Sequence, residues 1–352
     1  MALPDSLDKL GEYALHGEIA RILNNGSSTR VVGDDAAVLT IPDASDTRLL
    51  VSTDRLASGV APELRARLLV TQTLSDIICM GGYPLGMLLA IQVPRDSDPA
   101  MVLSLVESIN WNCQQYGCSL VGGDTKEGDI FSAVGVGFGT ARADKIVRRT
   151  RVEPGDLIGV TLASGAKWGK RWANHLVNHF SLDLAPDIRQ TLADSDQEFN
   201  LPVAESRMLI DRSLAVAGLD LSDGIGSSLR ILAEANGIGF DLSSNSLDEI
   251  IDQAVAPVAS ALGIHTRSFA LTPGYMWNNM YAVRSTDADA ARTCAQAAGG
   301  DFIIIAEATD KAGELLYDGS ANGALAAASD EKFRAWAWSD RTEWWLSNVR
   351  SI

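Results

Sequence analysis

The pattern of apolar and polar positions predicts three helices in the first half of the chain, over residues 10–24, 64–80 and 100–116. Within 64–80 the apolar residues recur every three or four positions, which is the spacing of one helical face. Gly81 and Gly82 follow directly and predict the end of this helix. The first half therefore contains at least two long amphipathic helices that need an apolar surface to pack against.

Short apolar or alternating runs predict strands between and after these helices, at 36–41, 49–53, 87–93, 119–121 and 131–140. The last run alternates with glycines, which would let a neighbouring element pack closely. After the turn signal Glu153-Pro154-Gly155-Asp156, the second half repeats the mixture, with strands at 157–161, 239–242, 280–283 and 302–306 and helices at 229–236 and 250–262. Segment 174–200 is predicted only as helix and loop. The fold class expected is α/β (α+β) in two domains, residues 1–150 and 151–352.

Composition narrows the possible functions. The formal net charge of −16 argues against binding to nucleic acid or to anionic membrane surfaces. The longest apolar stretch, about residues 84–93, is too short to span a bilayer, and the N-terminus lacks the basic and apolar regions of a signal peptide. The four cysteines suggest no disulfide framework, so reduced thiols and a cytoplasmic location are expected; they are Cys79, Cys113, Cys118 and Cys294.

Aspartates beside glycine, serine or threonine recur in five short motifs: Gly33-Asp34-Asp35, Ser52-Thr53-Asp54, Leu74-Ser75-Asp76, Gly122-Gly123-Asp124-Thr125 and Asp220-Leu221-Ser222-Asp223-Gly224. Taken singly, several have an ordinary interpretation as turns or helix caps. Carboxylates that converge repel each other, however, and a dry cluster of them needs cations. Hard oxygen ligands suit Mg²⁺, which usually bridges to nucleotide phosphates in such sites. Together the motifs predict a magnesium-dependent, ATP-using enzyme.

Two of the motifs are more specific than the others. Asp76 lies inside an apolar helix, where aspartate is unfavourable, so a ligand role is favoured over a structural one. Asp220 and Asp223 flank Ser222 just before a predicted helix, whose N-terminus could bind an anion. The chain has no Walker loop and no protein-kinase motifs. His175 and His179 lie four residues apart without a catalytic glutamate between them, so a zinc role is not favoured.

In this order, the blocks GDDAAVL, LLVSTD, TLSDIICMGGYPLG, LVGGDT, EPGD and LDLSDGIGSSL resemble those of thiamine-monophosphate kinases. More broadly, they resemble the superfamily of aminoimidazole ribonucleotide synthetase, selenophosphate synthetase and the hydrogenase-maturation dehydratase. The resemblance is clear over about residues 10–160 and 215–245. It implies a homodimer formed through the sheets of the N-terminal domain, and a C-terminal α/β domain with ATP in the cleft.

The resemblance also implies the site residues. The metal ligands would be Asp35, Ser52, Thr53, Asp54, Asp76, Asp124, Asp220 and Asp223. The ATP-binding residues would be Gly123, Asp124, Arg149 and Ser222, and Asp220 and Asp223 would act at the reacting group.

The chain departs from the family pattern where the family contacts its phosphate acceptor. Ala61 stands where the family has a histidine, and Tyr275 where it has a glutamate. Trp338 is one of several C-terminal tryptophans that match an aromatic stacking on the substrate ring, or that pack in the core or a dimer interface. The leading hypothesis is therefore an ATP- and magnesium-dependent phosphotransferase acting on a different or specialised small-molecule acceptor. The alternatives are ATP-dependent activation of an amide or carboxyl oxygen, and a non-catalytic nucleotide-binding homologue.

Overall fold

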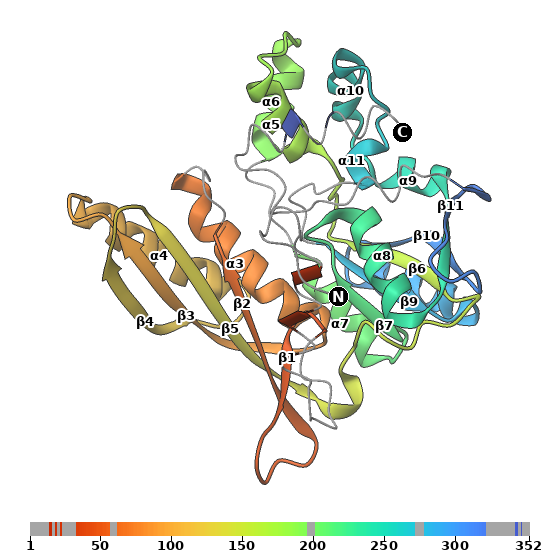
Figure 1. The fold of residues 1–352 in the computed structure, drawn as a ribbon, viewed down its shortest axis with the longest axis horizontal. Coiled ribbons are helices and arrows are strands. Elements are labelled where there is room, and N and C mark those ends of the chain that lie inside the picture. Colours follow the sequence, from red (N-terminus) through yellow and green to blue (C-terminus); the bar gives the residue numbers. More distant parts are fainter. Residues whose placement is uncertain are drawn as a thin grey trace.

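The computed structural model describes most of the chain (Figure 1), namely residues 33–56, 62–195, 201–271 and 278–321, with a few helical residues near both ends. Within these residues the chain forms two mixed sheets with helices packed against them, so the predicted α/β fold class is confirmed. Five residues of the predicted helix over 10–24 are described, and all five are helical: Ala14, Leu15, Glu18, Ile19 and Ile22. Ala61, Tyr275 and Trp338 lie outside the described residues.

The first sheet has the strand order β1-β2-β5-β3-β4. Its strands are β1 (Ala37–Thr40), β2 (Thr47–Arg55), β3 (Tyr83–Val93), β4 (Leu120–Glu127) and β5 (Ser132–Arg142). Only β3 and β4 pair in parallel. Two helices, α3 (Pro62–Cys79) and α4 (Pro99–Gln115), pack beside the sheet. Gly81 follows α3 with a φ of 88°, so its role in ending this helix is confirmed.

The glycines of β5 explain how α3 packs. A Cβ on Gly135 would lie 2.5 Å from Thr73 Oγ1, and one on Gly137 would lie 3.1 Å from Ile77 Cδ1. Both Thr73 and Ile77 belong to α3. Because the alternating glycines have no side chains, α3 can pack close to β5.

The opposite face of this sheet is apolar. A Cβ on Gly86 would lie 2.8 Å from Phe138 Cζ and 3.3 Å from Val121 Cγ1, which places these side chains together on the face away from α3. Leu88 lies on the same face, 39% exposed, and Val121 is 57% exposed. Among the described residues, this face has no helix to cover it (Figure 1).

One local prediction was wrong. The sequence suggested a strand over 119–121 with the Gly-Gly-Asp motif in the loop after it, but β4 continues to Glu127. Gly123 pairs with Leu89, and a Cβ there would lie only 1.8 Å from the Leu89 carbonyl oxygen. Glycine at position 123 thus has a structural reason, because the two strands could not pair around a side chain.

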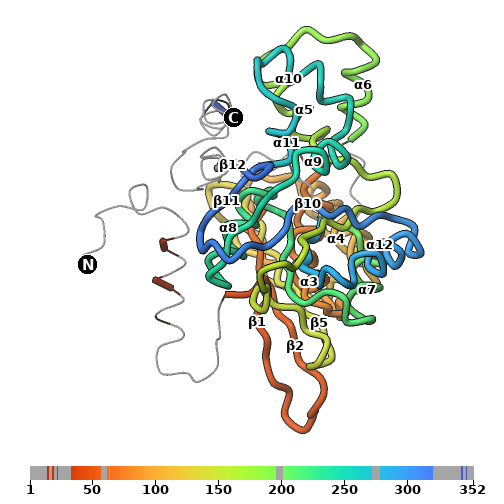
Figure 2. The backbone as a smooth tube through the Cα atoms, turned by 90° about the vertical axis from the view of Figure 1, so that its right-hand side faces the viewer, coloured from red at the N-terminus to blue at the C-terminus, as the bar shows by residue number. Residues whose placement is uncertain are grey.

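The second sheet has the order β12-β11-β8-β10-β6-β9-β7. Its strands are β6 (Leu157–Leu162), β7 (Ala217–Asp220), β8 (Gly239–Leu242), β9 (Asn279–Val283), β10 (Asp301–Thr309), β11 (Leu315–Tyr317) and β12 (Ser320–Ala321). The associated helices include α7 (Val203–Asp211), α8 (Gly224–Asn236), α9 (Ser244–Ile250), α11 (Ser268–Leu271) and α12 (Ala288–Ala297). At one end of the molecule, α5 (Lys170–His179) and α6 (Pro186–Asp194) lie beside α10 (Ala256–Leu262), opposite the loop that joins β1 and β2 (Figure 2).

The single helix predicted over 250–262 is interrupted. Ile251 instead forms a β-bridge with Trp168, and the Asp252 backbone N–H donates to the Trp168 carbonyl oxygen. The Asp252 side chain then accepts from the Ala254 N–H at 2.8 Å, which begins a new helical segment. An N-cap inside the apolar run therefore overrides its helical periodicity.

The last turn of α3 lies between the two sheets, where second-half residues bind it (Figure 1). Arg207 donates to the carbonyl oxygens of Gly81 and Gly82 at 2.9 and 2.7 Å, and Tyr281 donates to that of Cys79 at 3.1 Å. The bond from Tyr281 satisfies a carbonyl group that the helix end leaves without a partner, and the bonds from Arg207 bind the two glycines that follow the helix. The domain boundary near residue 150 stays a prediction.

All four cysteines are free, as the sequence predicted, and the structure shows that all four are buried. Among the helices of the described residues, none has the length and apolar character needed to cross a membrane.

Candidate metal and nucleotide site

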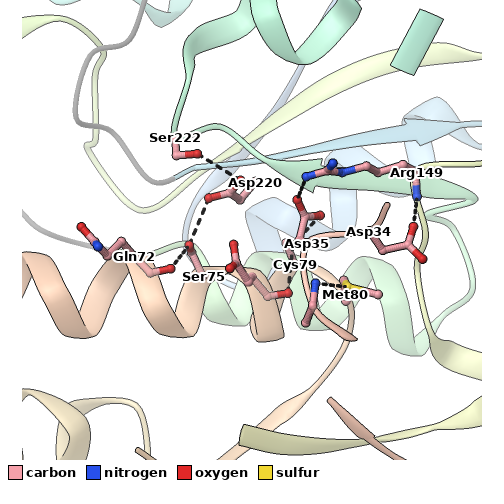
Figure 3. Close-up of polar contacts among 11 residues, drawn as sticks. Asp34, Asp35, Gln72, Ser75, Cys79, Met80, Arg149, Asp220 and Ser222 are labelled. Carbon is pink, nitrogen blue, oxygen red and sulfur yellow. Dashed lines mark hydrogen bonds and ion pairs between the residues drawn. The ribbon is translucent and has the colours of Figure 1, made fainter. Parts of the chain in front are cut away.

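Three carboxylates from distant parts of the chain meet between the two sheets, and Figure 3 labels two of them, Asp35 and Asp220. Asp35 lies in the loop before β1, Asp76 in the last turn of α3, and Asp220 at the end of β7. One ligand oxygen from each lies within 4.8 Å of the other two. These are three of the residues that the acidic motifs predicted to converge.

Two serines hold Asp220 in place. The Ser75 hydroxyl lies 3.1 Å from Asp220 Oδ2 and 2.9 Å from the Gln72 carbonyl oxygen, and the Ser222 hydroxyl lies 3.3 Å from Asp220 Oδ1. Ser75 comes from α3, so its contact with Asp220 also ties the first half of the chain to the second. The serines of the Leu-Ser-Asp and Asp-Leu-Ser-Asp motifs thus position the carboxylate through hydrogen bonds.

Arginines bind the two aspartates of the Gly-Asp-Asp motif. Arg149 Nη2 forms an ion pair with Asp35 Oδ1, and the side chain of Asp35 is only 1% exposed. Asp34 pairs with Arg148 and also accepts from the Arg149 backbone N–H at 3.1 Å. Asp34 therefore has a structural role in docking residues 148 and 149 against the loop, whereas Asp35 faces the cluster.

The electrostatics of the cluster favour a bound cation. Burial raises the pKa of Asp76 well above its ordinary value, and the charges of Asp220, Asp54 and Asp35 raise it further. Burial, together with Asp35, Asp223 and Asp54, raises the pKa of Asp220 to about 8. Asp220 therefore retains a proton near neutral pH, unless a cation replaces it. Asp76 also lies in the last turn of a helix, where the helix dipole disfavours a negative charge.

The residues fit a hard divalent cation and a phosphate beside it. Three convergent carboxylates supply the oxygen ligands that Mg²⁺ prefers. Arg149 supplies one positive charge, which offsets only part of the negative charge. Its Nε is buried and has no hydrogen-bond partner among the described residues. A buried guanidinium N–H without an acceptor can bind an anionic oxygen, such as one of a phosphate.

Other predicted ligands lie differently. Asp54 and Asp223 act electrostatically on the cluster. The Ser52 hydroxyl donates to the Thr73 carbonyl oxygen at 2.6 Å, and the Thr53 hydroxyl to that of Gly135 at 3.2 Å. Their roles as metal ligands stay predictions.

Gly123 and Asp124 lie on the exposed edge strand β4, outside the group of three converging carboxylates. The roles of Gly123 and Asp124 in binding metal and ATP therefore stay predictions.

Sequence reasoning missed several residues that support the site. Cys79, whose thiol lies 3.4 Å from Asp35 Oδ2, was read only as one of four reduced cysteines. Tyr281 lies in a buried strand, and nothing in its local sequence indicates a contact with α3. Ser75 offered a signal, because it is a polar residue in an apolar helix and is fully buried.

Comparison with known proteins identifies the family. Residues 33–141 match the family described as AIR synthase related protein, N-terminal domain. Thiamine-monophosphate kinase from Corynebacterium glutamicum is 30% identical over 293 residues, which is 78% of this chain and 84% of the relative. The chain belongs to the thiamine-monophosphate kinase family. The kinase of that name from Escherichia coli K12 is likewise 30% identical, over 72% of this chain and 75% of its own.

Solved structures agree with the fold of this kinase family. The structure described as AaThiL complexed with AMPPCP and TMP has a TM-score of 0.75 at 20% identity and covers 91% of this chain and 97% of that chain. The protein tt0281 from Thermus thermophilus has a TM-score of 0.76 at 24% identity, over 90% and 99%. Escherichia coli HypE, described as a hydrogenase maturation protein, has a TM-score of 0.62 at 19% identity, over 87% and 93%. Family membership makes this protein an ATP-dependent phosphotransferase of the kinase type.

Proposed function

We propose that this protein uses Mg²⁺ and ATP to phosphorylate a small-molecule acceptor that differs from thiamine monophosphate or is a specialised relative of it. The observation that supports the chemistry best is the buried convergence of Asp35, Asp76 and Asp220 beside Arg149. A cluster of this kind is unfavourable unless a cation is bound, so its presence favours a working metal site over a non-catalytic homologue.

Each residue has a distinct part in the proposed reaction. Asp35, Asp76 and Asp220 would hold Mg²⁺, which neutralises phosphate charge when bound. Arg149 would bind a phosphate oxygen through its unpartnered Nε, while its Nη2 stays on Asp35. Asp223 precedes the first residue of α8 and lies close enough to Asp220 to affect its charge, so it is placed to orient the attacking acceptor.

The acceptor is proposed from the sequence. The relatives are named thiamine-monophosphate kinases, and the name of one structural neighbour includes TMP. In this chain, Ala61 and Tyr275 stand where the family resemblance implies a histidine and a glutamate that contact the acceptor. A site that loses a charged pair and gains an aromatic ring should prefer a less polar or differently charged acceptor.

A steady-state assay tests this proposal. With ATP and Mg²⁺ present, thiamine monophosphate should give little or no phosphorylated product, while a panel of related alcohols and phosphate monoesters should include a better acceptor. A kcat/KM for thiamine monophosphate of about 10⁴ M⁻¹s⁻¹ or above would show that the two replacements are tolerated. Stoichiometric release of inorganic phosphate with an unphosphorylated product would instead support activation of an amide or carboxyl oxygen.

We also propose that two copies associate through the first sheet. The uncovered face holds Leu88, Val121 and Phe138, with Leu88 and Val121 substantially exposed. An apolar sheet face of this kind is typical of an interaction surface, and a second copy is the partner that the family resemblance implies.

A further inference from the structure

Two consecutive residues at the end of α3, each with a sulfur atom in its side chain, bind the loop that supplies Asp35 (Figure 3). The Cys79 thiol donates to Asp35 Oδ2 across 3.4 Å, and the Ala36 backbone N–H donates to Met80 Sδ across 3.1 Å. Both sulfur-containing residues are buried, at 0% and 1% exposure. Neither has a part in the phosphoryl transfer proposed above.

The Asp35 carboxylate is contacted at both of its oxygens. Arg149 Nη2 pairs with Oδ1, and Cys79 approaches Oδ2. The thiol has one proton and also lies 3.2 Å from the Asp76 carbonyl oxygen, so two acceptors compete for that proton. An ionised carboxylate is a stronger acceptor than a backbone carbonyl, so the thiol proton favours Asp35.

We propose that Cys79 is a positioning residue, which fixes the orientation of the Asp35 carboxylate toward Asp76 and Asp220 and so preforms the cation site. The inference rests on the proposed magnesium site. Residues that hydrogen-bond to metal ligands orient them, and their loss weakens metal binding. A thiol suits this position because it is a weak donor, and the carboxylate oxygen still has a lone pair for the cation.

Mg²⁺ binding to the nucleotide-free protein, measured by titration calorimetry, tests the inference without depending on activity. Cys79→Ala should weaken Mg²⁺ binding about tenfold, the lower end of the range for residues behind a metal ligand. Cys79→Val fills the space without a donor and should weaken it equally. Cys79→Ser retains a donor and should bind within about threefold of wild type.

Cys113→Ala is the matched control. Cys113 is equally buried in the same apolar core, but its thiol lies near Met87 Sδ at 3.8 Å. The Cys113→Ala substitution should lower the melting temperature by about as much as Cys79→Ala does, and it should leave the Kd for Mg²⁺ unchanged.

Three results would overturn the positioning role. They are a Cys79→Ala Kd within about twofold of wild type, an equal loss in Cys113→Ala, and a Cys79→Ser variant as weak as Cys79→Ala. Absence of Mg²⁺ binding by the wild-type protein would be a different outcome, because it would overturn the metal site itself and with it this inference.

Discussion

Replacing Asp220 with asparagine should stabilise the metal-free protein at alkaline pH while abolishing its response to Mg²⁺. In the folded protein the pKa of Asp220 is about 8, against an ordinary value of 3.8. The folded state therefore binds a proton that the unfolded chain releases above about pH 4. The stability contributed by the protonated form is complete below that pH and is lost as pH rises toward about 8.

The magnitude follows from the pKa difference. A pKa unit corresponds to about 1.4 kcal/mol, so the difference of about four units sets an upper limit of about 6 kcal/mol on the destabilisation at pH 8. Neighbouring carboxylates titrate together with Asp220, so we expect roughly half of that limit. For a chain of this length, about 3 kcal/mol corresponds to an increase in melting temperature of roughly 4 °C. Asparagine can still bond to the Ser75 and Ser222 hydroxyls, so the fold should be retained.

Thermal unfolding in EDTA, measured at about pH 5 and about pH 8, provides the test. Asp220→Asn should melt slightly above wild type at the lower pH and clearly above it at the higher pH. Added Mg²⁺ should raise the melting temperature of wild type but not of the variant. Asp96→Asn, which replaces an exposed aspartate far along the sequence from the cluster motifs, should follow wild type throughout. An Asp220→Asn protein that is less stable than wild type at the higher pH would refute the electrostatic reasoning.

Three further outcomes are expected. Asp76→Asn should abolish turnover because it removes a metal ligand, while its circular dichroism spectrum should show a folded protein because the substitution relieves repulsion among the carboxylates. Near-full activity would show that the assignment of Asp76 as a ligand is wrong. Asp124→Asn, on the exposed edge strand, should also abolish turnover if Asp124 completes the site. Light scattering at micromolar concentration should give a dimer mass, which Leu88→Lys lowers and Leu103→Lys, an exposed leucine on α4, does not; a wild-type monomer would contradict the proposed interface. Mg²⁺ affinity should rise between about pH 6 and pH 8 because the ligands must lose protons, whereas a flat profile would indicate that Asp220 is not a ligand.

The sequence predicted the local elements better than their arrangement. Helix 64–80 and strand 239–242 follow directly from apolar spacing and from the glycines that bound them. Strand β7 was missed because Ala217–Asp220 is only four residues long and has no distinctive alternation. The strand orders depend on contacts between distant segments, and no local pattern encodes them.

Some residues of the candidate site could also be predicted from the sequence. A buried aspartate inside an apolar helix signalled Asp76, and the paired aspartates before α8 signalled Asp220. The pairing of Arg149 with Asp35 could not be predicted, because it depends on how the residues between the two sheets return to the loop before β1. The role of Cys79 was equally inaccessible, since a cysteine beside an apolar run looks like ordinary core.

The central claim is that the buried carboxylates bind Mg²⁺ in order to bind ATP, and titration calorimetry with a non-hydrolysable ATP analogue tests it most directly. We predict a binding heat with Mg²⁺ present, a loss of most of that heat in EDTA, and a similar loss in Asp76→Asn with Mg²⁺. Equal, negligible heats for the wild-type protein in both conditions would contradict the claim, as would Mg²⁺-dependent binding that persists unchanged in Asp76→Asn.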